Sequence, residues 1–242
     1  MKKPQMILFD YGNTLLYEPD VDFVRATESL LKYAKSNKRG LTPKEICNFS
    51  QFFFDKVSNV RKMDLEIHQW QFQRFLYEYL EIDLFISQSE VERIFWNSVS
   101  EGALMPNVDK MLDAITRLGI RSGVISNIGW SEAVLSERIN HLLPKNKFEF
   151  IIASSEYVFR KPSPMLFELA LRKAGLDAEN VWFCGDSLEA DIEGSAAVGM
   201  FPVWYDNKTI ESPWRRKNDR IILSCEHLHI HDWSELIKIL QK

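Results

Sequence analysis

The sequence predicts an α/β protein with a doubly wound parallel sheet and an all-helical segment inserted after the first strand. Three observations lead to this prediction. The apolar run Met6–Phe9 is too short for an independent helix and ends on Asp10, so it fits a buried central strand. Residues 18–102 show helical periodicity and no clear strand pattern. From Leu104 onward, strand and helix patterns alternate, which is typical of a parallel sheet.

Helix signals follow one another through the inserted segment. Apolar residues from Val21 to Ala34 recur at helical spacing, up to a stop near Lys38-Arg39-Gly40. Thr42-Pro43-Lys44-Glu45 has the pattern of a capping box, with threonine at the N-cap and glutamate at the third helical position. The stretch Leu65–Leu80 is rich in aromatic residues, and Ser87-Gln88-Ser89-Glu90 begins the last expected helix of the segment.

These patterns divide the chain into two expected domains. Residues 1–17 and 103–242 form an α/β core, and residues 18–102 form a separate helical cap. The core strands expected after the insertion are Gly123–Ile125, Phe148–Ala153, Val181–Cys184, Phe201–Trp204 and Ile221–Leu223. The core helices expected between and after them are Val108–Ile115, Ser131–Leu143, Pro164–Ala174, Leu188–Val198 and Trp233–Leu240.

Composition is that of an ordinary globular protein, with 242 residues of which 45% are hydrophobic. The net charge of −4 and the pI of about 5.8 give no basic excess that would favour a nucleic acid or an acidic membrane as partner. Cys47, Cys184 and Cys225 lack CxxC spacing, which favours a reducing compartment over a disulfide framework. There is no signal-peptide pattern and no apolar stretch of membrane-spanning length. We therefore expect a soluble cytoplasmic protein, whose oligomeric state the sequence leaves open.

Polar residues follow several of the expected strands. Asp10 follows the first strand, Ser126-Asn127 follow the second, and Asp186 follows a later one, with Asp191 close behind it; Lys161 lies between a strand and a helix. Because the carboxyl ends of parallel strands share one edge of the sheet, these side chains can converge. Carboxylates in this number can hold a hard cation such as Mg²⁺, and a lysine and a hydroxyl can bind phosphoryl oxygens. This edge therefore suits magnesium-assisted phosphoryl transfer.

Four short motifs occur in a fixed order along the chain. They are Phe9-Asp10-x-x-x-Thr14-Leu15, Val124-Ile125-Ser126-Asn127, Lys161-Pro162-x-Pro164 and Gly185-Asp186-Ser187-x-x-x-Asp191. With these motifs and the helical insertion, the chain resembles the haloacid dehalogenase superfamily over nearly its whole length. The branch that it resembles is phosphatase-like and carries a helical cap after the first strand.

The resemblance implies roles for the motif residues. Asp10 would attack phosphorus and form an aspartyl-phosphate that water hydrolyses. Lys161, Ser126 and the backbone of Asn127 would hold the transferring phosphoryl group of a small-molecule substrate, and Thr14 would brace the nucleophile loop of this phosphate site. The groups implied as Mg²⁺ ligands are the carboxylate of Asp10, the backbone carbonyl of Gly12, and the carboxylate of Asp186 with Asp191 in support.

Gly12 departs from the pattern of the phosphatases that the chain resembles. They carry a second aspartate two positions after the nucleophile, which protonates the leaving oxygen and later deprotonates water. Gly12 has no side chain for this task, so we expect the rate to depend steeply on the leaving group unless Glu18 or His68 takes over. A glycine could also be needed at this position because the backbone has a positive φ.

Two alternatives to a phosphatase stay open from the sequence. One is a phosphate-binding pseudo-enzyme with little turnover. The other is a phosphonate (C–P) hydrolase, because similar branches that cleave C–halogen or C–P bonds also lack the second aspartate. The dehalogenases do without the metal site that Asp186 and Asp191 suggest, whereas a phosphonate hydrolase would need a cap lysine for a Schiff base. The insertion offers Lys32, Lys35, Lys38, Lys44, Lys56 and Lys62.

Three histidines alternate near the end of the chain. On a strand, His227, His229 and His231 would share one face, so a second metal site is conceivable there. Because the sequence shows no cysteine pair or carboxylate cluster beside them, a surface segment before the last helix is the favoured interpretation.

Overall fold

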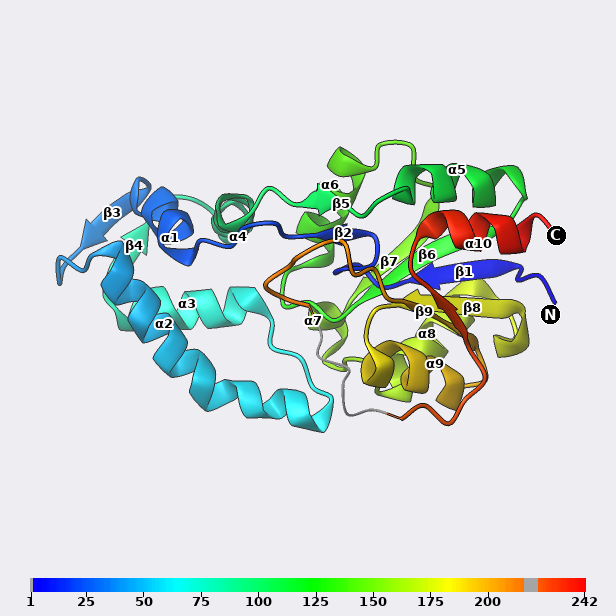
Figure 1. Cartoon of the computed structure of the whole chain (residues 1–242). Coiled ribbons are helices and arrows are strands. Elements are labelled where there is room, and N and C mark those ends of the chain that lie inside the picture. Colours follow the sequence, from blue (N-terminus) through cyan, green and yellow to red (C-terminus); the bar gives the residue numbers. More distant parts are fainter. Residues whose placement is uncertain (1, 216–221) are drawn as a thin grey trace.

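The computed structural model describes residues 2–215 and 222–242. Figure 1 shows two lobes along the molecule. One lobe contains the large sheet, its covering helices and both marked chain ends, and the other contains most of the segment inserted after the first strand.

Within the described residues, six parallel strands form the large sheet. Their order across the sheet is β10 (Leu228–Ile230), β9 (Phe201–Tyr205), β8 (Val181–Gly185), β1 (Met6–Phe9), β6 (Arg121–Ser126) and β7 (Phe148–Ala153). β1 is central and fully buried, and Phe9 lies opposite Val124 of β6 and Cys184 of β8. This confirms the expected α/β fold and brings the carboxyl ends of β6, β1 and β8 side by side.

Helices cover both faces of the sheet, as a doubly wound fold requires. Ile7 and Phe9 belong to one buried cluster, and Met6 and Leu8 belong to another. The first cluster includes residues of α5 (Val108–Arg117), α6 (Glu132–Leu142) and α10 (Trp233–Leu240), and the second includes residues of α8 (Pro164–Ala174). Because β1 faces apolar packing on both sides, all of its residues are apolar. Shorter helical pieces are α7 (Ser154–Tyr157), the 3₁₀ turn Ala178–Asn180, the π-helical turn Leu188–Glu193 and α9 (Gly194–Ala197).

Most of the inserted segment is helical. Its helices are α1 (Phe23–Leu31), α2 (Pro43–Val57), a 3₁₀ helix (Ser58–Met63), α3 (Gln69–Tyr79) and α4 (Gln88–Val99). Their apolar faces enclose a separate buried cluster that includes Leu30, Leu76 and Val91. The capping boxes that begin at Thr42 and Ser87 both form, which confirms these two helix starts.

The expectation of an all-helical insertion is wrong in one place. β3 (Ala34–Asn37) pairs antiparallel with β4 (Ile82–Leu84) in a two-stranded sheet within residues 18–102. α1 therefore ends at Leu31 rather than near Lys38. Both strands are short and partly polar, and each needs a partner distant in sequence, so neither shows a strand pattern by itself. Buried Ile82 anchors the pair to the helical cluster.

The edge of the large sheet also differs from expectation. Of the expected strand Ile221–Leu223, Ile221 lies outside the described residues, and Ile222 and Leu223 are not in a strand. The edge strand is β10, which contains His229.

The chain passes between the two lobes at a pair of short strands. β2 (Leu16–Tyr17) pairs antiparallel with β5 (Ala103–Leu104). This pair lies at the expected ends of the inserted segment. In the part of the chain that the structure describes, no helix combines the length and apolarity needed to cross a membrane.

Candidate active site

Asp10 lies at the carboxyl end of the central strand. Its backbone N–H donates to the carbonyl oxygen of Cys184 at 2.9 Å, so pairing with β8 continues one residue beyond β1. Ser126 ends β6 on one side, and Gly185 ends β8 on the other and leads into Asp186. The sheet thus brings residues from three separate motifs to one edge, as predicted.

Carboxylates converge at this edge. Asp10, Asp186 and Asp191 each offer an oxygen, and these oxygens all lie within 4.8 Å of one another. The backbone N–H of Ser187 donates to Asp191 Oδ2 at 2.9 Å, which fixes that side chain. A Cβ on Gly185 would lie 2.3 Å from the same oxygen, so only glycine leaves room for Asp191. This set of hard oxygen donors fits Mg²⁺.

Lys161 is buried among these carboxylates. Its side chain is 1% exposed, and its Nζ lies 2.7 Å from Asp10 Oδ1 and 2.6 Å from Asp191 Oδ1. Burial lowers the pKa of this ammonium, but the charges of the two carboxylates more than offset that effect, so the pKa is raised above its ordinary value. Lys161 is therefore a fixed positive charge at the centre of the site.

Asn127 positions the segment that carries Lys161. Its Nδ2 donates to the backbone carbonyl of Lys161 at 2.7 Å, and its Oδ1 accepts from the backbone N–H of Lys161 at 2.7 Å. The sequence suggested a role only for the backbone of Asn127. The side chain has this further structural task, because the amide matches both backbone groups of one residue.

A cavity of about 850 Å³ connects the residues at the sheet edge. Asp10, Gly12, Ser126, Asn127, Lys161, Asp186 and Asp191 all line it. Thr14 is the exception among the expected site residues. It is fully buried outside this lining, and its Oγ1 has no hydrogen-bond partner among the described residues. Its backbone carbonyl accepts from Trp233 Nε1 at 3.1 Å, which ties the loop after Asp10 to α10.

Gly12 has room for a side chain. A Cβ built there meets no atom within 4 Å, and Gly12 is not among the glycines with positive φ. The left-handed residue of this loop is Asn13, with φ of 55°. The idea that a positive φ requires glycine at position 12 is therefore wrong.

Glu18 also lines the cavity and is 8% exposed. Its Oε1 accepts from the hydroxyl of Tyr11 at 3.2 Å and lies 3.5 Å from Arg138 Nη1. Burial raises the pKa of the Glu18 carboxyl, and the negative charge of Asp10 adds to this, while Arg138 and the Tyr11 hydrogen bond oppose it. His68 does not line this cavity, and its Nε2 lies 3.7 Å from Glu156 Oε1. Of the two suggested substitutes for an acid at position 12, Glu18 has the better position.

The insertion also contributes to the wall of the cavity. Arg61, Lys62 and Trp96 line it, together with Arg160 from the loop before Lys161. Of these residues, the sequence pointed only to Lys62, as one of the candidate lysines for a Schiff base. Helical periodicity does not show which polar side chains turn toward another lobe.

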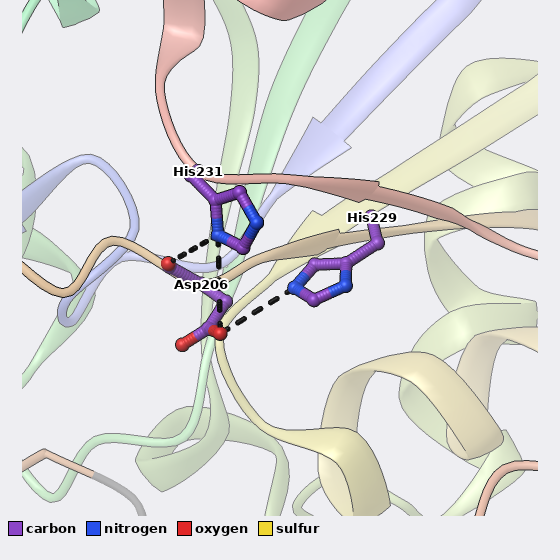
Figure 2. Close-up of side chains that lie close together, drawn as sticks. All are labelled: Asp206, His229 and His231. Atoms are coloured by element: carbon purple, nitrogen blue, oxygen red, sulfur yellow. Dashed lines mark hydrogen bonds and ion pairs between the residues drawn. The ribbon is translucent and has the colours of Figure 1, made fainter.

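In the structure, a carboxylate lies beside two of the alternating histidines, His229 and His231. Asp206 follows β9, and a ligand atom of each of Asp206, His229 and His231 lies within 4.8 Å of the others. Figure 2 shows that the two rings and the carboxylate face one another. The sequence argument against a second metal site lacked this aspartate, which comes from the neighbouring strand.

Comparison with protein families agrees with the observed fold. The family described as haloacid dehalogenase-like hydrolase matches residues 7–204. The chain therefore belongs to the haloacid dehalogenase-like hydrolases.

Individual proteins also resemble the chain, in sequence or in structure. Glyceraldehyde 3-phosphate phosphatase of Pyrococcus abyssi is 34% identical over 101 residues, which is 42% of each protein. The chain thus spans less than half the length of this curated relative. A haloacid dehalogenase phosphatase from Thermococcus onnurineus has a similar structure, with a TM-score of 0.63 and 19% identity over 99% of this chain and 98% of the other. A 2-haloacid dehalogenase from Pseudomonas syringae pv. Tomato has a TM-score of 0.62 and 21% identity over 100% and 99%. At these identities the two structures show the fold alone.

Proposed function

We propose that this protein is a Mg²⁺-dependent phosphatase that acts on a small phosphate ester or anhydride through Asp10. The convergence of Asp10, Asp186 and Asp191 around the buried ammonium of Lys161 carries this proposal. The phosphatase relative from Pyrococcus abyssi supports the reaction type, although its own substrate is not transferred to this chain.

The proposed reaction has two steps. A carboxylate oxygen of Asp10 attacks phosphorus, the bond between phosphorus and the leaving oxygen breaks, and an aspartyl-phosphate forms. Water then attacks phosphorus, the bond between phosphorus and the Asp10 oxygen breaks, and the proton lost by water passes to solvent. Inorganic phosphate leaves and the Asp10 carboxylate is restored. Lys161, the Ser126 hydroxyl and the backbone N–H of Asn127 stabilise the charge on the transferring phosphoryl group.

The proposed Mg²⁺ site uses oxygen donors at the sheet edge. The metal supplies Lewis-acid stabilisation of the phosphoryl oxygens. The residues that would hold it are Asp10, Gly12 through its backbone carbonyl, Asp186 and Asp191. Thr14 supports the nucleophile loop through its backbone contact with α10.

We also propose that residues 18–102 form a cap domain on a core made of residues 1–17 and 103–242. The separate apolar cluster of the insertion and the β2–β5 crossing support this division. Because Arg61, Lys62 and Trp96 come from the insertion and line the cavity, the cap would select the substrate. Because Arg61 and Arg160 are both paired with Glu66, the wall favours a phosphorylated compound with a further polar group rather than a further negative charge. The composition supports a cytoplasmic location with no nucleic-acid or membrane partner.

A phosphonate hydrolase is the second candidate function. One observation favours it: of the insertion lysines considered for a Schiff base, Lys62 lines the cavity. Against it, Lys62 is an exposed residue, whereas a lysine nucleophile is usually activated by desolvation. Borohydride trapping with phosphonoacetaldehyde would label wild type but not Lys62→Arg if this candidate is correct.

A phosphatase screen with and without Mg²⁺ tests the leading proposal. Asp10→Asn should abolish turnover and leave the fold intact, because the amide has the size of the carboxylate but cannot act as the nucleophile. Asp113→Asn is the matched control, because Asp113 is exposed on α5. Full activity in Asp10→Asn would contradict the proposal. Phosphate binding without turnover by wild type would indicate a pseudo-enzyme.

A further inference from the structure

A second group of possible metal ligands lies on the edge of the sheet, next to the candidate active site. His229 lies on β10, His231 follows it, and Asp206 follows the neighbouring strand β9. His229 is in register with Trp204, and Ile230 with Tyr205, so His231 comes beside Asp206. Because alternate residues of a strand share one face, both histidines point to the same side as Asp206. Figure 2 shows the three side chains gathered there.

The distances within this group suit a shared ion. Asp206 Oδ2 lies 3.4 Å from His229 Nε2 and 3.9 Å from His231 Nδ1. A ligand atom from each residue lies within 4.8 Å of the other two. Zn²⁺ binds nitrogen and carboxylate oxygen at about 2.0–2.2 Å, so separations of this size can be spanned by one ion between the ligands.

The surroundings hold part of the group in place. The ring of His229 stacks on the indole of Trp204, with centroids 3.8 Å apart and planes 14° apart. His231 Nδ1 lies 3.0 Å from the backbone carbonyl oxygen of Asp206. This contact needs a proton on Nδ1, so it has to be given up before Nδ1 can bind a metal. The carboxylate side chain of Asp206 is 11% exposed. The ring of His229 and the carboxylate of Asp206 are therefore held in place before any ion binds, whereas His231, whose side chain is 54% exposed, can turn to meet the ion.

We propose that Asp206, His229 and His231 form a binding site for a divalent transition metal of the zinc class, distinct from the Mg²⁺ site. Two imidazoles and one carboxylate match the ligands of zinc sites that keep a further position for water. Mg²⁺ prefers an all-oxygen shell, so the donor set separates this site from the carboxylates at Asp10.

Two positively charged side chains contact Asp206 and would compete with a metal for its carboxylate. Arg215 Nη2 lies 3.3 Å from Asp206 Oδ1, whereas the histidines lie nearest Oδ2. The contact with Arg215 can therefore persist when a metal binds. Lys208 Nζ lies 3.3 Å from Oδ2 and has to leave when a metal binds. The side chain of Lys208 is 71% exposed, so its ammonium can turn into water at little cost.

The site lies close to the catalytic edge and joins two strands. Asp206 and Asp186 line the same small cavity of about 20 Å³, which has room for about one water. An ion at the proposed site would link β9 to the edge strand β10 without using a ligand of the active site. It should therefore stabilise the folded chain.

The test is titration of the untagged full-length chain with Zn²⁺ in a non-chelating buffer that contains saturating Mg²⁺. We expect one zinc-binding event that is weakened roughly tenfold or more in His229→Asn and in His231→Asn. His227→Asn is the matched control, because His227 is on the same segment but outside the group. Both replaced side chains are at least 37% exposed, so the variants should fold like wild type.

Cobalt provides a second readout that does not depend on activity. Co²⁺ bound by imidazoles with an open position absorbs visible light strongly, whereas Co²⁺ in an octahedral all-oxygen site absorbs weakly. We expect the strong absorption in wild type and His227→Asn and its loss in His229→Asn. Absence of zinc binding in wild type, unchanged zinc binding in both test variants, or equal loss in the His227 control would overturn the proposal.

Discussion

At the residue scale, Gly12 has no side chain that could act as an acid, whereas Glu18 has a buried carboxyl. Both residues line the same cavity as Asp10. Because burial raises the pKa of Glu18, this carboxyl keeps its proton to a higher pH than an ordinary glutamate. A carboxyl that carries a proton can donate it to a leaving oxygen. Because Glu18 lines the cavity and His68 does not, we expect Glu18 to act as the general acid.

The first prediction concerns Glu18→Gln. The variant should lose activity toward alkyl phosphates by roughly 10²–10⁴-fold, because their alkoxide leaving groups need protonation. Activity toward aryl phosphates such as p-nitrophenyl phosphate should change little, because phenolates leave without help. The measurement is kcat/KM over a leaving-group series, with His68→Asn as control. Equal losses for all leaving groups would show a structural role, and a steep series in wild type would show that no acid exists.

The pH dependence has a definite sign. Because the acid must be protonated, wild-type kcat/KM for alkyl phosphates should fall as pH rises through the raised pKa of Glu18. The contribution of Glu18 to the free energy of unfolding also falls as pH rises. A raised pKa gives stability that is present below the unfolded-state pKa and is lost as pH rises through the folded-state value. Glu18→Gln should remove both effects.

Gly12→Asp should fold normally, because its Cβ meets open space, and should restore activity toward alkyl phosphates in the Glu18→Gln background.

The second prediction concerns Lys161, whose ammonium lies between Asp10 and Asp191. Lys161→Met should abolish turnover and lower the free energy of unfolding by about 3–5 kcal/mol, because it leaves buried carboxylates without their cation. Mg²⁺ should raise the melting temperature of the variant more than that of wild type, since the ion would replace the lost charge. Lys145→Met, at an exposed loop position, should match wild type in thermal melts with and without Mg²⁺. Identical Mg²⁺ shifts in Lys161→Met and wild type would contradict the assigned metal site.

At the scale of helices and strands, the sequence predicted the helix caps and the parallel sheet, but it did not predict the antiparallel pair in the insertion. The capping boxes at Thr42 and Ser87 act within one helical turn, so the sequence shows them directly. The motif residues around Asp10 and Asp186 follow buried strands, and parallel pairing alone brings them together. β3 could not be predicted in this way, because its strand conformation depends on pairing with β4.

The same limit applies to contacts between elements. The histidines near β10 were visible as a pattern, but their partner Asp206 follows a different strand, β9. Glu18 was visible only as a nearby carboxylate, and its raised pKa depends on burial beside Tyr11 and Arg138. Contacts between distant residues and the pKa shifts of buried groups depend on three-dimensional packing, which the periodicity of the sequence does not show.

The third prediction concerns the junction of α3, α4 and α6 at Glu92. This residue of α4 is fully buried, and its carboxylate accepts from Trp70 Nε1 at 2.5 Å and from the N–H and hydroxyl of Ser131 at 2.6 Å each. All its partners are donors, and an ionised carboxylate is purely an acceptor. Glu92→Gln sets an amide donor against them and should lower the free energy of unfolding by about 1–3 kcal/mol. Denaturant melts measure this. Glu101→Gln, at an exposed position, should change it little, and an equal effect in both variants would contradict the account.

At the scale of the whole molecule, the insertion contacts the core away from the β2–β5 crossing. The backbone N–H of Glu66 donates to the Val158 carbonyl at 2.6 Å, and that of Arg160 donates to the Asp64 carbonyl at 2.9 Å. The N–H of Gln69 donates to the carbonyl of Gly129 at 2.7 Å. Arg160 directly precedes Lys161, so this contact connects the insertion to the loop that carries the central ammonium.

The last prediction concerns the carboxylate of Glu66, whose side chain is 1% exposed at this contact. It lies 2.8 Å from Arg61 Nη2 and 3.4 Å from Arg160 Nη1, and it accepts from Ser154 Oγ at 3.0 Å. Because Arg160 and Ser154 belong to the proposed core, Glu66→Gln should weaken the contact between the two lobes. We expect faster hydrogen exchange in residues 58–69 and 154–161, a larger radius of gyration and a raised KM. Glu28→Gln, at an exposed position of α1, should leave all three at wild-type values. If exchange in both segments of Glu66→Gln stays at the wild-type rate, the two lobes are held together by other contacts.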